Sequence, residues 1–175
     1  AYMSFGRCES LTSITGGGQL EFIDNAAFVR CDALTSVNFP EGVKTLFGNT
    51  FFRWAELRSL NLPTSLQCIG VNPVTGCEQL SSLTVTAGSR YFKAIDGALY
   101  ATTGATVVGQ EPNANGDPDQ PTVLVAVPTA IENKALNVPD GVRAIGYQAA
   151  REVPLTSIAL PKSLQAIRGK IGRAH

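Results

Sequence analysis

The chain has 175 residues, of which 44% are hydrophobic, and this is enough for one domain with a continuous core. Its 14 basic and 14 acidic residues balance, so the excess of Lys and Arg with which nucleic-acid-binding proteins displace counterions is missing. No apolar run approaches the roughly 18 residues of a membrane-spanning helix, and no basic segment followed by an apolar one marks a signal peptide.

The first half of the chain repeats every 23 residues. Four segments align in phase, and they start at Phe5, Phe28, Phe51 and Val74. Three columns of the alignment hold leucine (Leu11, Leu34, Leu57, Leu80), serine (Ser13, Ser36, Ser59, Ser82) and aliphatic residues (Ile14, Val37, Leu60, Leu83).

The pattern L-x-x-L-x-L in each unit predicts a short strand. Side chains alternate along a strand, so the fourth and sixth positions face the core while the third and fifth face outward. One unit cannot bury its apolar columns alone, but stacked units bury them against one another. We therefore predict a mainly β solenoid of about 23-residue coils, with stacked parallel strands, turns and short helical or 3-10 segments, as one domain over residues 1–175.

Residues 101–122 interrupt the repeat. They are poor in core-forming residues and rich in turn formers, so we expect a protruding loop or hairpin extension. Oxygen ligands alternate over residues 113–119 in the manner of a calcium loop, but Leu124 stands where an EF-hand places its Glu, and no helices flank the segment. A solvated turn is the preferred interpretation, with calcium binding as the alternative.

The repeat returns from Leu136 and again from Pro154, with Pro139 and Pro161 in the same column. Neither terminus has the polar composition of a capping coil, and Ala1 is not an initiator Met. We therefore expect a processed or trimmed piece that continues beyond at least one end, or whose ends are covered by an oligomer contact.

The units F-x-x-C-x-x-L-T-S-V-x-F-P-x-G-V-x-x-L (28–46) and L-P-x-S-L-x-x-I (62–69 and 160–167) resemble BspA-like leucine-rich repeats, which occur mainly in bacterial surface and secreted proteins. The stretch YFKAIDGALY (91–100) resembles a hairpin unit that interrupts such arrays, so a hairpin and a loop insertion are expected over residues 91–135. Trp54 in place of the usual Cys, and Ala149-Ala150 in place of Ala-Phe, depart from the pattern. The resemblance implies adhesion or ligand binding at the cell surface or in a secreted protein, and it brings no catalytic residues.

Cys8, Cys31 and Cys77 share one repeat column, and this indicates a ladder of small side chains inside the coils. A disulfide between Cys8 and Cys31 on adjacent coils is the alternative, although side chains stacked in parallel rarely reach the required geometry. A zinc site would need paired Cys-x-x-Cys or a nearby His, and neither is present.

The sequence contains no plausible catalytic set. The only histidine is the last residue, His175, so a Ser or Cys nucleophile has no base, and the carboxylates are scattered singly. We therefore predict that the chain is not an enzyme and uses no cofactor or metal.

Outward positions of the predicted strands form a sheet rich in hydroxyl and amide groups. The simplest interpretation is a solvated face with hydrogen-bonded ladders; the functional one is a ligand face for a protein or a glycan. Arg58, Asn61 and Trp54 are its candidate anchors, although the place of Trp54 in the Cys column favours the interior. The candidate partner-binding residues are Ser36, Asn38, Arg58, Ser59, Asn61, Ser82 and Thr84.

These observations favour a non-catalytic binding or adhesion module outside the cell, with an unknown protein or glycan partner, no nucleic acid and no transmembrane segment. The alternative is a structural spacer in a larger surface protein whose functional domain lies elsewhere. A third possibility is an accessory segment of a carbohydrate-active enzyme.

Overall fold

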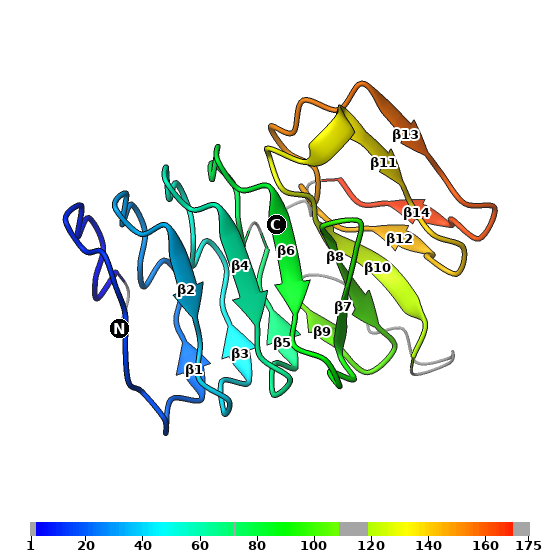
Figure 1. The fold of residues 1–175 in the computed structure, drawn as a ribbon. Coiled ribbons are helices and arrows are strands. Elements are labelled where there is room, and N and C mark those ends of the chain that lie inside the picture. Colours follow the sequence, from blue (N-terminus) through cyan, green and yellow to red (C-terminus); the bar gives the residue numbers. More distant parts are fainter. Residues whose placement is uncertain (1–2, 72, 109–118, 170–175) are drawn as a thin grey trace, which may run out of the picture.

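The structure is a computed structural model that describes residues 3–71, 73–108 and 119–169. The chain winds into a solenoid of about six turns spaced about 23 residues, and Figure 1 shows the coils side by side from β1 to β6. The predicted architecture is therefore confirmed. In the described residues the only helix is a 3-10 turn, η1 (Glu132–Lys134).

One side of the coils carries a parallel sheet in the order β2 (Ser36–Asn38), β4 (Ser59–Leu62), β6 (Ser82–Val85). Its register places Val37 beside Leu60 and Leu60 beside Leu83, so each residue of a strand lies beside the equivalent residue of the next repeat. These three side chains are buried, whereas their neighbours along each strand face outward, as the alternation predicts.

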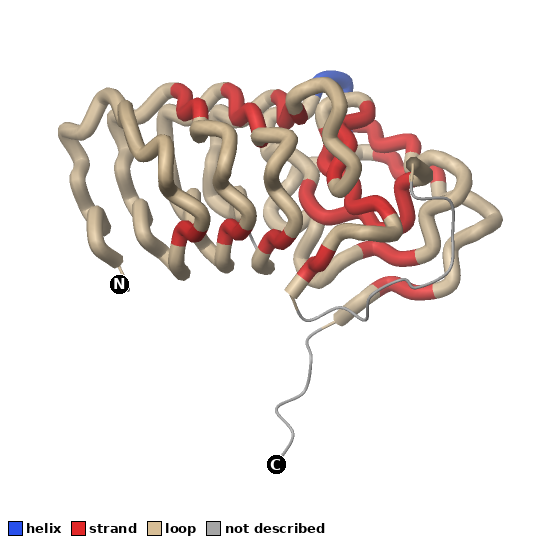
Figure 2. Tube along the Cα trace, turned by 90° about the horizontal axis from the view of Figure 1, so that it is seen from below, coloured by secondary structure: helices blue, strands red, loops and turns tan. Residues whose placement is uncertain are grey.

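The opposite side of the coils carries a second row of shorter strands (Figure 2). This parallel sheet has the order β1 (Phe22–Ile23), β3 (Thr45–Leu46), β5 (Cys68–Ile69), β9 (Thr106–Val107). The apolar columns fill the space between the two rows, and Leu34, Leu57 and Leu80 are each 0% exposed there.

Beyond β6 the strands are arranged differently. β7 (Phe92–Ile95) and β8 (Ala98–Thr102) form an antiparallel hairpin, and β10 (Pro121–Ala126) pairs antiparallel with β8. β12 (Ala144–Ile145) and β14 (Ala166–Ile167) extend this sheet in parallel, in the order β14-β12-β10-β8-β7. β11 (Ala135–Asn137) pairs in parallel with β13 (Ser157–Ala159), so coils of the first kind resume after the hairpin.

β8 separates two hydrophobic cores. Leu99 and Ala101 belong to the core of the first coils, whereas Ala98 and Tyr100 belong to the core of the last coils. All five residues of β8 are buried, because successive side chains of a strand point to opposite sides and each side meets a different core. The hairpin therefore lies between the two stacks of coils and packs against the core of each.

The sequence predicts a protruding loop or a hairpin extension over residues 101–122. The described parts are not a protruding loop, and the strands at the two ends of this segment, β8 and β10, pair antiparallel. Ala101 and Thr102 end β8, residues 106–107 add a strand to the row of β5, and Thr122 lies buried in β10. Residues 109–118, with nearly all of the candidate calcium loop, lie outside the described residues. Small and β-branched side chains were taken for loop residues because their burial depends on partners far away in the sequence.

The shared Cys column ties each coil to the one before it. The Cys31 thiol donates to the Phe5 carbonyl at 3.3 Å, and the Cys77 thiol donates to the Phe51 carbonyl at 2.9 Å. Trp54 stands in the same column with 0% exposure, and its indole N–H donates to the Phe28 carbonyl. Each donor reaches a carbonyl 26 residues earlier. Trp54 therefore replaces a cysteine because it supplies the same hydrogen bond, and its predicted interior place is confirmed.

The end coils of the described residues expose apolar side chains. Phe5 (52%) and Phe22 (58%) do so at the first coil, and Leu160 (47%) and Ile167 (67%) at the last. That further coils or an oligomer contact cover these ends stays a prediction.

We predict that Cys31 and Cys77 resist thiol reagents in the native protein. All four cysteines are free, and burial raises the pKa of Cys77 to about 12 and that of Cys31 to about 11, so both stay protonated and unreactive at pH 8. Mass spectrometry after native and denatured alkylation should show these two modified only after unfolding. Rapid native labelling of Cys77, or a Cys8–Cys31 disulfide under non-reducing conditions, would contradict this packing.

We predict that Gly70→Ala lowers the free energy of unfolding by about 3 kcal/mol. A Cβ at Gly70 would stand 2.1 Å from the backbone nitrogen of Gly48 in the preceding coil, and backbone cannot move aside cheaply. Gly18→Ala is the matched control, because its Cβ meets nothing within 4 Å, so its stability should stay constant or rise by up to about 1 kcal/mol. Urea denaturation that finds equal stability for the two variants would refute the close approach of the coils.

Candidate functional site

The outward side chains of the first sheet form a polar face, defined here as Ser36, Asn38, Arg58, Ser59, Asn61, Ser82 and Thr84. The strand register sets them in two rows. Ser36, Ser59 and Ser82 make one row, and Asn38, Asn61 and Thr84 make the other. Arg58 immediately precedes β4, with its side chain 70% exposed and 3.9 Å from the Glu56 carboxylate. The structure thus brings all seven sequence-predicted residues together.

Part of the polar face is tied by its own hydrogen bonds. The Thr84 hydroxyl donates to Asn61 Oδ1 at 3.0 Å, and Asn61 Nδ2 donates to the Thr86 hydroxyl at 2.9 Å. These contacts fix the orientation of the amide between β4 and β6. Such a ladder agrees with simple solvation of the sheet. It also restrains the Asn61 and Thr84 side chains, so the face itself loses less conformational entropy when a partner binds.

The parallel sheet that carries the polar face ends at β6. In the repeat alignment β11 is the next equivalent strand, yet the two do not pair, because the β7–β8 hairpin comes between them. The Leu83 N–H donates instead to the Gly97 carbonyl at 2.9 Å, and the Ala130 N–H donates to the Leu80 carbonyl at 2.8 Å. The interruption therefore closes the edge of β6 with a turn rather than with another coil.

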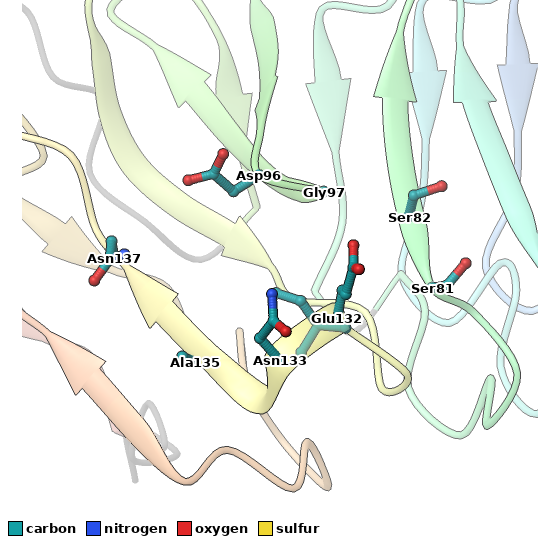
Figure 3. A pocket seen from close by; sticks show the side chains of 9 residues that line it. Ser81, Ser82, Asp96, Gly97, Glu132, Asn133, Ala135 and Asn137 are labelled. Carbon is teal, nitrogen blue, oxygen red and sulfur yellow. The ribbon is translucent and has the colours of Figure 1, made fainter.

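A cleft of about 370 Å³ opens at this interruption. Figure 3 shows its walls: β6 on one side, the turn of the hairpin above, and η1 with β11 opposite. Its volume falls within the range of small-ligand sites in proteins. The lining residues are Ser81, Ser82, Asp96, Gly97, Ile131, Glu132, Asn133, Ala135 and Asn137.

Two carboxylates from separate elements stand in the cleft, Asp96 on the hairpin turn and Glu132 on η1. Both are exposed, and no Lys or Arg within residues 3–71, 73–108 and 119–169 forms an ion pair with either. Hydroxyl groups of two serines and side-chain amides of two asparagines provide the rest of the polar lining. Ser82 belongs both to the cleft and to the polar face, so the two are continuous.

The backbone around the cleft adopts left-handed conformations. Asp96 (φ 49°) and Gly97 (φ 77°) form the two-residue hairpin turn for which Asp-Gly is favoured. Asn133 (φ 62°) and Lys134 (φ 50°) follow the same pattern in η1, and a lysine rarely does so. Left-handed residues also recur in the turns of other coils, as at Arg30 and Arg53, so at the cleft they define the turns and do not by themselves indicate a ligand.

Tyr100, in the core of the last coils, has a buried hydroxyl without a hydrogen-bond partner within the described residues. The side chain is 0% exposed and packs in the same core as Ile131, which lines the cleft. Among the described residues its hydroxyl is the buried side-chain group without a hydrogen-bond partner. Burial, and secondarily the negative charge of Asp96, raise the pKa of Tyr100 to about 12. The hydroxyl therefore stays protonated at neutral pH, and the negative charge of Asp96 acts on it.

No metal or membrane-spanning element stands out in the part of the chain that the structure describes. There, no group of three or more His, Cys, Asp or Glu side chains is placed to hold a metal ion. Every helix there is too short to cross a bilayer. His175 lies outside the described residues, while Asp119, at the end of the candidate calcium segment, pairs with Lys93 at 3.6 Å.

The sequence-family comparison identifies a repeat family. A model of the BspA-type leucine-rich repeat region matches residues 1–100, in six copies. No curated protein matches the chain.

Solved structures of bacterial repeat proteins have the same fold. A leucine-rich repeat protein from Eubacterium ventriosum superposes with a TM-score of 0.68 at 16% identity, over 94% of this chain and 45% of its own. A leucine-rich cell surface protein from Faecalibacterium prausnitzii gives 0.53 at 23% identity, over 95% and 50%. The pneumococcal vaccine antigen PcpA gives 0.54 at 20% identity, over 87% and 45%. The chain thus spans about half the length of these proteins or less.

We predict that Tyr100→Phe raises the free energy of unfolding by about 1 kcal/mol, because it removes a buried hydroxyl that has no partner. Tyr147→Phe is the matched control. Its hydroxyl accepts a hydrogen bond from Gln148 Nε2 at 2.9 Å, so its removal should lower stability slightly. Guanidinium denaturation in which Tyr100→Phe loses more than the control would mean that the Tyr100 hydroxyl is satisfied in solution.

Proposed function

The chain belongs to the family of BspA-type leucine-rich repeat proteins, and on that basis we propose that it is a non-catalytic binding module. It presents the polar face of β2, β4 and β6, together with the adjoining cleft, to a protein or glycan partner outside the cell. The observation that carries this proposal is the continuity of a hydroxyl- and amide-rich face with a cleft at its edge.

The fold supports such a surface without help from a partner. Each strand of the polar face is held by hydrogen bonds to its neighbour and by a buried column beneath it, so the outward groups keep their spacing in the free protein. A preformed surface loses little conformational entropy on binding. The face also carries little charge, which leaves hydrogen-bond pattern and shape to select the partner.

Two of the similar structures support a proposal for the place of action. One similar structure is described as a cell surface protein and another as a vaccine antigen. We extend this to the present chain and propose the cell surface or a secreted form as its location. The buried free thiols do not conflict with that location, since each one serves a hydrogen bond between coils.

The alternative proposal is a structural spacer that carries a functional domain elsewhere in a longer protein. It is favoured by the internal hydrogen bonds of Asn61 with Thr84 and Thr86, which satisfy part of the face without any ligand. The two proposals differ in whether substitutions on the polar face change the binding of any molecule.

We predict that Arg58→Ala and Asn61→Ala each weaken partner binding tenfold or more, because each removes an outward hydrogen-bonding group near the centre of the face. The assay is a surface-binding screen of the purified chain against extracellular-matrix proteins and glycans. Gln67→Ala, an exposed amide that immediately precedes β5 in the second row of strands, is the control and should bind as the unchanged chain does.

Thermal unfolding of the same variants is needed, since Asn61→Ala also removes two hydrogen bonds within the face. A folded Arg58→Ala chain with undiminished binding to its ligand would refute the assignment of the polar face. A screen without any ligand would favour the spacer.

A further inference from the structure

We propose that the cleft between β6 and β11 receives a basic side chain of a partner protein, an arginine in preference to a lysine. This rests on the proposed function, because it assigns a partner chemistry to the edge of the polar face. It selects a protein over a glycan as the occupant of the cleft.

The first argument is charge. Asp96 and Glu132 enter the cleft from different elements, and the lining contains no basic residue to neutralise them. A neutral partner that covered the cleft would strip water from two carboxylates without replacing their interactions, which is costly. A cationic group avoids that cost and gains charge-assisted hydrogen bonds, which are stronger than those between neutral groups.

The second argument is the hydrogen-bonding character of the lining. Besides the carboxylates, the cleft is lined by Ser81, Ser82, Asn133 and Asn137, whose side chains carry oxygen atoms able to accept an N–H. The Ser81 hydroxyl donates its own proton to the Arg58 carbonyl at 3.3 Å. A guanidinium has five N–H donors in a fixed plane and accepts nothing, so it suits a cleft with acceptors on several walls better than an ammonium does. The lining holds no aromatic ring on which the apolar face of a sugar could stack.

The third argument concerns Tyr100, a buried residue on which the charge of Asp96 acts. The buried Tyr100 hydroxyl lacks a partner, and Asp96 is the carboxylate whose charge acts on it. An unpaired polar group in a core is rare and costs stability. A cation bound beside Asp96 would offset the negative charge that acts on this hydroxyl.

The cleft is also accessible in the way that the proposal requires. It opens beside Ser82, at the end of the polar face, so a partner lying across β2, β4 and β6 reaches it with one extended side chain. The left-handed residues of the hairpin turn and η1 hold both carboxylates on short, defined segments rather than on long loops. One anchoring side chain in a preformed cleft is the usual arrangement of a binding hot spot.

The test is a titration of the ¹⁵N-labelled chain with N-acetylarginine amide, monitored by amide chemical shifts. We expect saturable shifts at Ser82, Gly97 and Asn133. N-acetylcitrulline amide has nearly the same shape without the charge and should cause no saturable shift there. N-acetyllysine amide with a free ε-amino group should bind more weakly than the arginine compound.

The double variant Asp96→Asn, Glu132→Gln should lose at least tenfold in affinity for N-acetylarginine amide. Asn is favoured at the Asp96 turn position, so the hairpin should be retained, and the amide spectrum of the variant verifies this. The matched control is Asp32→Asn, Glu9→Gln, which removes one Asp and one Glu from earlier coils and should leave the affinity unchanged.

The proposal is overturned if the citrulline compound binds equally well, if the control variant loses as much affinity as the cleft variant, or if the shifts map elsewhere. A neutral disaccharide that shifts the same amides and binds equally to the cleft variant would assign the cleft to glycans instead. These outcomes are separable from those of the surface screen. A partner that binds through Arg58 and Asn61 but ignores the cleft variant would leave the binding module standing and refute only the present inference.

Discussion

The whole structure depends on one constraint: a coil has no core of its own and buries its apolar column only against the coils beside it. Val37, Leu60 and Leu83 occupy the same position in successive repeats and lie side by side, as that constraint requires. The hydrogen bonds from the Cys column to the carbonyls of the preceding coil reinforce it. Because the inner positions are fixed by stacking, only the outward positions are free to vary with a partner.

The same constraint explains why the interruption is built as it is. Any element inserted between coils must offer an apolar surface to both sides, and β8 does so by turning Leu99 to one core and Tyr100 to the other. The hairpin restores burial but does not continue the outward sheet, so β6 and β11 remain apart. This gap between β6 and β11 forms the cleft beside the polar face, and Asp96 and Glu132 line it.

Periodicity made most of the fold predictable, since columns such as Leu34, Leu57 and Leu80 report burial directly. The alignment placed Trp54 in the Cys column, but the hydrogen bond that it shares with the cysteines could not be predicted from the sequence. The strands at residues 101–102 and 106–107 could not be located from the sequence, because they pair with residues far away in the chain, such as Ala101 with Val123 and Val107 with Ile69. The polar face followed from strand alternation, whereas the cleft assembles residues far apart in the sequence, and only the Asp-Gly turn hinted at it.

The most direct test of this account is a set of methyl–methyl nuclear Overhauser effects in a chain with labelled Leu and Val side chains. Stacking predicts effects from Val37 to Leu60 and from Leu60 to Leu83, and the dividing hairpin predicts none from Leu83 to its repeat equivalent, Leu136. A direct effect between Leu83 and Leu136 would mean that the coils run on without interruption, and the cleft would not exist. Absence of the first two effects would contradict the solenoid itself.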